Sequence, residues 1–195
     1  YAKQDKPAVT NLKFEAMRGL FDKSRKLMVH VDGSREILHA LDFKKQFDIE
    51  LVIVGGADSW MVTEQLRQFN VPVLLGNVHA LPGAPEDDVD LPYKLPYLLQ
   101  KDGVLFGLTI WGSWEQRNLA FHAGTAAAYG LSKEQALAAI SYNVAKILGI
   151  DKQTGTLEAG KDANLFISLG DALDMRTNQL EAAFIQGREI DLTDH

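Results

Sequence analysis

Histidine is the residue type through which this sequence can most directly do chemistry. The chain has five histidines and no cysteine, so a bound metal ion would have to be held by His, Asp or Glu. His30 lies near the end of the apolar run "LMVHV", and His79 follows another apolar run in "GNVHALPG". The alternative for His30 is a structural histidine bonded to a carbonyl, and for His79 an exposed loop histidine. His122 stands among small apolar residues, where packing is the expected role.

Aromatic and charged residues gather after the fourth apolar run of the sequence. Trp111, Trp114 and Arg117 are followed by Asn118, and aromatic rings beside an arginine can bind a carboxylate or a ring-shaped substrate. Tryptophans at strand ends equally often close the top of a barrel, so both interpretations stay open. The acidic run at residues 86–90 lacks the alternating ligands and fixed glycine of a calcium loop, which indicates a solvated loop.

The composition narrows the class of protein. The 195 residues carry a formal net charge of -6 and are 46% hydrophobic, as expected of a folded globular domain. A nucleic acid or an anionic membrane would need a basic face, so we expect neither as a partner. No apolar run reaches the roughly twenty residues that span a bilayer. The chain begins with Tyr1, and we expect it to be a piece of a longer protein.

Four short apolar runs alternate with helical stretches. The runs are rich in Val, Leu and Ile without polar alternation, which is typical of parallel strands covered on both faces. Their starts lie roughly twenty to thirty residues apart, the length of one strand and helix unit. The pattern predicts a parallel α/β fold. The predicted strands cover residues 27–31, 50–54, 71–75 and 104–110, and the predicted helices cover residues 34–47, 59–69 and 91–101.

The C-terminal part of the chain follows a different pattern. Ser132 is predicted to cap a helix that runs to Leu148, and Gly149 to end that helix in a left-handed conformation. Two short antiparallel strands are predicted at residues 164–168 and 182–185, with a tight Gln-Gly turn after the second.

Four strand and helix units fit either a doubly wound sheet or half of an eight-stranded barrel. The stretch "HVDGSREI" has one glycine where a dinucleotide fingerprint needs three, which disfavours nucleotide binding. A receiver-like domain would need an acidic cluster at the end of the first strand, where the sequence offers only Asp32. The half barrel is therefore the favoured architecture.

The C-terminal segment resembles a known family. "GLSKEQALAAISYNVAKILGIDKQTGTLEAGKDANLFI" is similar to the C-terminal signature of amidohydrolases, a helix ending in N-x-A-K-x-L-G and then G-x-L-x-x-G-K-D-A-x-L. Upstream, "RNLAFHAGTAAAYGLS" resembles the stretch after barrel strand eight. The likeness is greatest to imidazolonepropionase-related amidohydrolases, especially a divergent bacterial branch. It implies that residues 1–150 form the C-terminal half of a (β/α)8 TIM-type barrel, and residues 151–195 a returning segment of a small composite β-sandwich.

The resemblance also implies a metal site. Amidohydrolases place metal ligands at the carboxyl ends of barrel strands, where a divalent ion such as zinc activates water. His30 resembles the strand-five histidine, and Asp32 either orients it or caps a turn. The strand-six histidine is missing near Gly55, and the strand-eight aspartate is missing from "GLTIWGSW". Unless Glu115 or Asp58 replaces that aspartate, the usual proton acceptor is absent.

Two functions follow from the resemblance. The first is hydrolysis of a non-peptide C–N bond of the cyclic amide type, with a small-molecule substrate contacted by His79, Trp111, Trp114 and Arg117 at the barrel mouth. The second is a metal-free, non-catalytic binding or scaffold protein. Half a barrel exposes two sheet edges, so we expect the fragment to be inactive alone and to associate with the missing N-terminal half of the protein or with a second copy.

Overall fold

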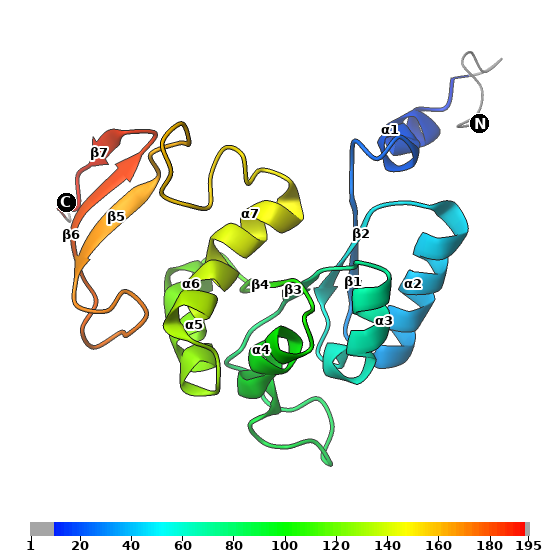
Figure 1. Cartoon of the computed structure of the whole chain (residues 1–195), viewed down its shortest axis with the longest axis horizontal. Helices are drawn as coiled ribbons and strands as arrows, with labels where there is room; N and C mark the ends of the chain where they lie inside the picture. The colour runs from blue at the N-terminus through cyan, green and yellow to red at the C-terminus, as the bar shows by residue number, and fades with distance from the viewer. Residues whose placement is uncertain (1–9, 194–195) are drawn as a thin grey trace.

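The computed structural model describes residues 10–193, in which helices lie between a parallel sheet and a small antiparallel sheet and further helices lie beside the parallel sheet, on the side farther from the small sheet (Figure 1). The parallel sheet has the order β1-β2-β3-β4, so strands adjacent in the chain are adjacent in the sheet. The elements are α1 (Leu12–Phe21), β1 (Leu27–Val31), α2 (Ser34–Phe47), β2 (Leu51–Gly55), η1 (Ser59–Val62), α3 (Thr63–Gln68), β3 (Val73–Leu75), α4 (Leu91–Lys101), β4 (Phe106–Leu108), η2 (Glu115–Asn118), α5 (Leu119–Ala128), α6 (Lys133–Ile140), α7 (Tyr142–Leu148), β5 (Leu165–Leu169), β6 (Gln179–Ile185) and β7 (Arg188–Ile190).

The predicted parallel α/β fold is confirmed, and β1, α2 and α4 have the predicted bounds. Strand β3 starts two residues later than predicted, and β4 is shorter than predicted at both ends. The amides of Val71 and Val104 donate to Leu66 O and Leu99 O, which are carbonyls of the preceding helices. The amides of these two buried valines therefore bond to the preceding helix and not to a neighbouring strand. Helix α1 was not predicted, although Asn11 caps it by accepting from Lys13 N at 3.0 Å.

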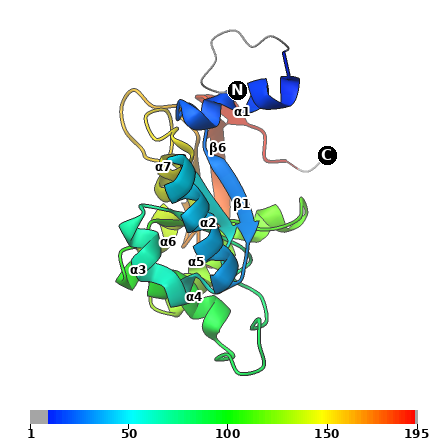
Figure 2. The same cartoon turned by 90° about the vertical axis from the view of Figure 1, so that its right-hand side faces the viewer.

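The two faces of the parallel sheet bury different sets of side chains. The register aligns Val29, Ile53, Val73 and Phe106 in one row, and these residues pack in the main core with the helices. Helix α2 lies against β1 on this covered face (Figure 2). Because successive strand residues point to opposite faces, the next row faces the other way. That row contains His30, Val54 and Leu74.

Coverage of both faces, predicted for all four strands, is wrong for β1. Strand β2 is buried throughout, but β1 alternates between half-buried and exposed residues, and Met28 and His30 are its exposed positions. The described helices that cover the opposite face of β1 do not reach this one. His30 therefore stands on the open face of the edge strand.

The predicted single helix from Ser132 to Leu148 is wrong, because the chain breaks at Ser141 into α6 and α7. Ser141 has φ -132° and ψ -90°, and its hydroxyl donates to Leu137 O at 2.7 Å. Such a bond back to the preceding turn bends helices. The break lets α7 pack Ile147 against Val52 and Leu74 on the second face of the sheet. The predicted cap at Ser132 and the left-handed Gly149, with φ 76°, are confirmed.

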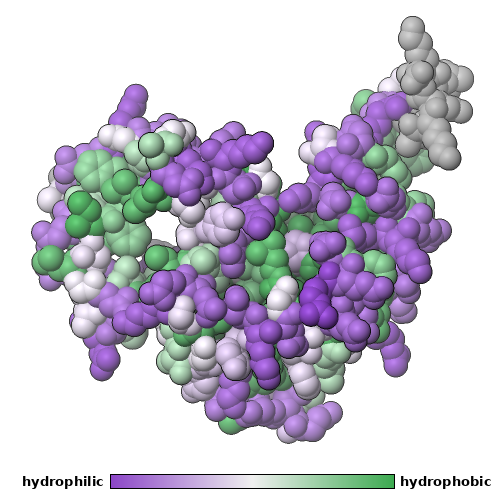
Figure 3. Space-filling model, in the orientation of Figure 1, coloured by the Kyte–Doolittle hydropathy of each residue, from purple (hydrophilic) through white to green (hydrophobic). Residues whose placement is uncertain are grey.

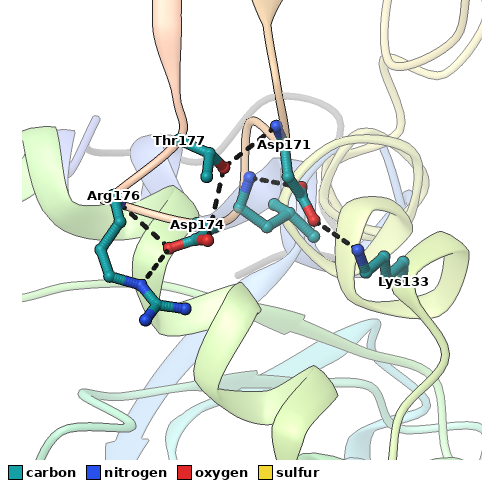
Figure 4. A network of polar contacts seen from close by, with 6 residues as sticks. Lys133, Asp171, Asp174, Arg176 and Thr177 are labelled. Carbon is teal, nitrogen blue, oxygen red and sulfur yellow. Dashed lines mark hydrogen bonds and ion pairs between the residues drawn. The ribbon is translucent and has the colours of Figure 1, made fainter.

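The small sheet β5-β6-β7 is antiparallel, and its β6–β7 turn has positive φ at Gln186 and Gly187 as the sequence predicts. Its apolar side chains, including Phe166 and Ile185, are largely exposed, and apolar residues gather on this lobe of the surface (Figure 3). A polar network fixes the β5–β6 connection to α6 through Lys133 (Figure 4). No helix among residues 10–193 is long and apolar enough to cross a membrane.

Replacing Gly124 by alanine should test how closely the β5–β6 connection packs on α5. A Cβ at Gly124 would collide with the carbonyl of Leu173, whose side chain is buried in the main core. We expect Gly124→Ala to lower the free energy of unfolding by about 1–3 kcal/mol in urea denaturation, because backbone must move to relieve the overlap. Gly33→Ala is the control, since its Cβ would lie 3.6 Å or more from other atoms. Equal stability of both variants would contradict this packing.

Candidate functional site

The carboxyl ends of the four parallel strands meet at one edge of the sheet and continue into loops that touch one another. Gly56 N donates to Val31 O at 2.8 Å, Gly76 N donates to Gly55 O at 3.3 Å, and Thr109 N donates to Leu75 O at 2.9 Å. Ligand sites of open parallel sheets and of barrels lie at this edge. The residues that follow the strands are therefore the candidates for function.

A pocket of about 290 Å³ lies at this edge, and we call it the strand-end pocket. Its size is at the small end of the range of about 300–1,000 Å³ for small-molecule sites. Carboxylates, apolar residues of the β3–α4 loop and one indole ring line it. Its lining includes Asp32, Asp58, Asp87, Leu81, Pro92 and Trp111.

All three carboxylates in the strand-end pocket accept from loop amides, Asp87 from Ala84 N at 2.9 Å. Asp32 accepts from Ala57 N at 3.3 Å, and Asp58 accepts from Ser34 N at 3.1 Å. A Cβ at Gly55, which has φ +102°, would lie 2.6 Å from the Asp32 carboxylate. Asp32 therefore caps the loop after β2, the turn-capping alternative of the two roles considered for it. No side chain fits at Gly55 while Asp32 holds this position.

Trp111 connects the strand-end pocket to His30. Its backbone N donates to the side-chain oxygen of Asn77 at 3.0 Å, and a Cβ at Gly76 would lie 2.9 Å from its indole nitrogen. Its ring centroid is 5.7 Å from that of His30, at an interplanar angle of 42°. Asn77 was not singled out in the sequence, because an asparagine after a strand normally indicates only a turn.

The second tryptophan of the predicted cluster stands apart from the pocket. Trp114 is 78% exposed, and the guanidinium carbon of Arg117 lies 5.5 Å from its ring centroid. This distance permits a cation–π interaction. Neither residue lines the strand-end pocket. Of the four residues predicted to contact substrate, only Trp111 lines this pocket.

His79 is an exposed loop residue, the alternative considered for it, and its side chain contacts α5 and does not line the pocket. Its Nε2 is 2.7 Å from the Thr125 hydroxyl, and its ring centroid is 4.0 Å from that of His122. His122 is 3% exposed, and its Nδ1 has no hydrogen-bond partner within the described residues. Burial, and secondarily the nearby His79, lowers the pKa of His122 to about 4. The packing role expected for His122 agrees with this burial.

The described residues do not form a closed metal site. No group of three or more His, Asp or Glu side chains among residues 10–193 is placed to hold a metal ion. His30 is the one predicted ligand, its ring lies against Trp111, and Asp32 is engaged by the loop after β2. A zinc centre needs at least three protein ligands. The residues of this chain therefore do not by themselves fit the metal that the family resemblance implies.

A larger groove of about 880 Å³ separates β5 from α6 and α7 and is visible as an opening beside the small sheet (Figure 3). Apolar side chains such as Leu137, Tyr142 and Phe166 line it. None of the predicted site residues is part of this lining. Because carboxylates and an indole ring line the strand-end pocket, we take it as the candidate site.

The burial of His122 predicts a loss of stability in mild acid. Its pKa is about 4 in the folded chain and 6.5 for an ordinary histidine, so the unfolded chain binds more protons between these values. The free energy of unfolding should therefore fall by up to about 3 kcal/mol as the pH drops from about 6.5 to 4. His122→Phe should remove this part of the pH dependence in urea denaturation. An NMR titration midpoint of His122 near 6.5 would contradict the prediction.

The comparisons with known proteins agree in one family. Residues 99–190 match the amidohydrolase family. Amidohydrolase tasK of Hapsidospora irregularis is 36% identical over 121 residues, which are 55% of this chain and 12% of that protein.

The fold comparison covers nearly the whole chain. An amidohydrolase from Thermotoga maritima MSB8 matches with a TM-score of 0.86 and 29% identity, over 95% of this chain and 48% of that chain. An adenosine deaminase from Xanthomonas campestris, with bound zinc, matches with a TM-score of 0.58 and 17% identity, over 93% of this chain and 49% of that one. The chain thus spans about half the length of these structures. Residues 99–190 carry the sequence pattern of the amidohydrolase family, and the chain has the fold of part of an amidohydrolase.

Proposed function

We propose that the protein to which this chain belongs is an amidohydrolase-type hydrolase that acts on a non-peptide C–N bond of a cyclic amide. The observation that carries the proposal is the strand-end pocket, which lies where parallel α/β enzymes place their active sites. The family match and the likeness to the Thermotoga maritima amidohydrolase support it. The closer assignment, to relatives of imidazolonepropionase, rests on the sequence pattern alone.

We propose further that the parallel sheet is the C-terminal half of a (β/α)8 barrel and that β5, β6 and β7 belong to a composite sandwich. Strands β1 and β4 each have one unpaired edge among the described strands. The open face that carries Met28 and His30 would line the barrel interior. The natural partner of this surface is the missing half of the barrel, and a second copy of the chain is the alternative. A half with four more strands would pair both edges.

Substrate contacts are proposed for Trp111 in the pocket and for Trp114 and Arg117 outside it. The indole of Trp111 offers a flat wall on which the ring of a cyclic amide can lie. Arg117 and Trp114, farther out, could receive a carboxylate of the same small molecule. His30 is proposed as the one metal-facing residue of this half, and the other ligands of a divalent ion such as zinc would belong to the missing half. We derive no catalytic step through that ion, because this chain does not hold it.

A second function, a metal-free binding or scaffold protein, is favoured by the geometry at Gly55. The family resemblance implies a histidine near Gly55, and at Gly55 itself the carboxylate of Asp32 occupies the space of any side chain. A barrel that kept its pocket and lost its metal would still bind a small molecule at the strand ends. Metal content distinguishes the two functions.

Elemental analysis of the protein purified with both barrel halves should show about one divalent metal ion per chain, since structural and catalytic zinc sites are stoichiometric. His30→Ala should lose this metal and lower hydrolysis of a cyclic amide by at least about 10²-fold, because loss of a ligand should cost no less than loss of its supporting residues. His39→Ala, on the exposed side of α2, is the matched control. A metal-free wild-type protein that still binds substrate analogues would establish the scaffold function instead.

The isolated chain should not remain a monomer, because two free strand edges and an open apolar face promote pairing. Light scattering is expected to show a dimer or larger species, and adding the missing half should convert it into a one-to-one complex. Met28→Glu, which places a charge on the open face of β1, should weaken both associations. Phe43→Glu, on the exposed side of α2, should leave them intact. A monodisperse monomer at high concentration would contradict the half-barrel proposal.

A further inference from the structure

The wall of the strand-end pocket that lies opposite the strands is a long loop without regular structure. It covers residues 76–90, between β3 and α4, and contributes Val78, Ala80 and Leu81 to the lining. Loops of about this length without helix or strand are uncommon in compact domains unless they serve a function. Whatever holds this loop in place therefore sets the shape of the pocket.

His79 and its two neighbours in this loop make different contacts. Val78 is 2% exposed and lines the pocket together with Ala80, whereas the side chain of His79 lies against α5. The Thr125 hydroxyl donates to Phe121 O at 3.1 Å, which leaves its oxygen to accept from the Nε2–H of His79 at 2.7 Å. With the Thr125 hydroxyl donating to the carbonyl, the hydrogen bond selects the tautomer of His79 that carries its proton on Nε2.

Two aromatic rings lie near the imidazole of His79, in addition to this hydrogen bond. His122 of α5 lies 4.0 Å away in a tilted stack, and Tyr93 of α4 lies 6.3 Å away with its ring edge-on at 84°. Because His122 is buried, it stays neutral at ordinary pH and does not repel His79. The loop thus contacts both α4 and α5 through His79.

We propose that His79 is a positioning residue, which anchors the loop 76–90 to Thr125 and His122 and thereby shapes the strand-end pocket without contacting the bound molecule. The assignment replaces the substrate contact that the sequence suggested for His79. It rests on the proposed function only in treating the pocket as the binding site. The anchor itself is a property of the loop and can be measured without any substrate.

Hydrogen–deuterium exchange of peptides from the loop 76–90 tests the anchor. His79→Ala and Thr125→Val should each speed exchange about tenfold, the effect of losing roughly one hydrogen bond of support. The double variant should be no faster than either single variant, because both remove the same interaction. His79→Gln and Thr125→Ser, which keep a donor and an acceptor, should restore most of the protection. Unchanged exchange in Thr125→Val would overturn the proposal.

The ring stack has its own control. His122→Phe keeps an aromatic platform and removes the unpartnered nitrogen, so the loop should exchange as in the wild type. His122→Ala removes the platform and should speed exchange. NMR should detect the Nε2–H proton of His79, protected from solvent exchange by the hydrogen bond, in the wild type, and this protection should be lost in Thr125→Val, a signature specific to this hydrogen bond. Faster exchange in His122→Phe than in His122→Ala would contradict the stacking contact.

Turnover separates positioning from direct contact in the protein with both barrel halves. His79→Ala and Thr125→Val should raise KM by the same factor and leave kcat within about twofold, because both act only through the shape of the pocket. A larger increase in KM for His79→Ala than for Thr125→Val would show that His79 touches the substrate and would overturn the proposal. If the protein has no hydrolase activity, the exchange and NMR experiments still decide whether the anchor exists.

Discussion

The structure depends on the burial of one face of the parallel sheet. Ile53, Val73 and Phe106 lie in register across β2, β3 and β4, and each is at most 1% exposed beneath the helices. Because strand residues alternate between faces, this burial determines that His30, Val54 and Leu74 point the other way. It also brings the strand ends level, so that the loops that follow them meet at one edge. The candidate site is a consequence of this register.

The burial of only one face of the sheet also explains why the described residues do not complete a metal site around His30. The helices of residues 10–193 cover one face of the sheet, and α7 covers only part of the other through Val144 and Ile147. The uncovered part carries His30 beside Trp111, with no further metal-ligating side chains grouped around it in the described chain. In the proposed half barrel, His30 would gain further metal-ligating neighbours only when the other half covers this face.

Local sequence patterns predicted the elements whose bounds depend on their own residues. They did not predict features that depend on contacts between distant parts of the chain. The apolar run at residues 27–31 and the helix at residues 34–47 were predicted to the residue, because both are defined by their own composition and flanking turns. The break at Ser141 was missed, since serine is compatible with a helix and the bend is stabilised by packing of α7 on the sheet. The direction of His79 depends on Thr125, which is separated from it by 46 positions in the chain.

The geometry at Gly55 disfavours any side chain at this position. A histidine at this position would meet the Asp32 carboxylate and would need φ +102°, a conformation unfavourable for any residue except glycine. Removing Asp32 in turn would free the amide of Ala57 and disturb the loop after β2. A histidine at position 55 would therefore also require changes at Asp32 and in the loop after β2. In the proposed half barrel, the groups that activate water would come from the other half or from Asp58 and Asp87, each of which also accepts from one loop amide.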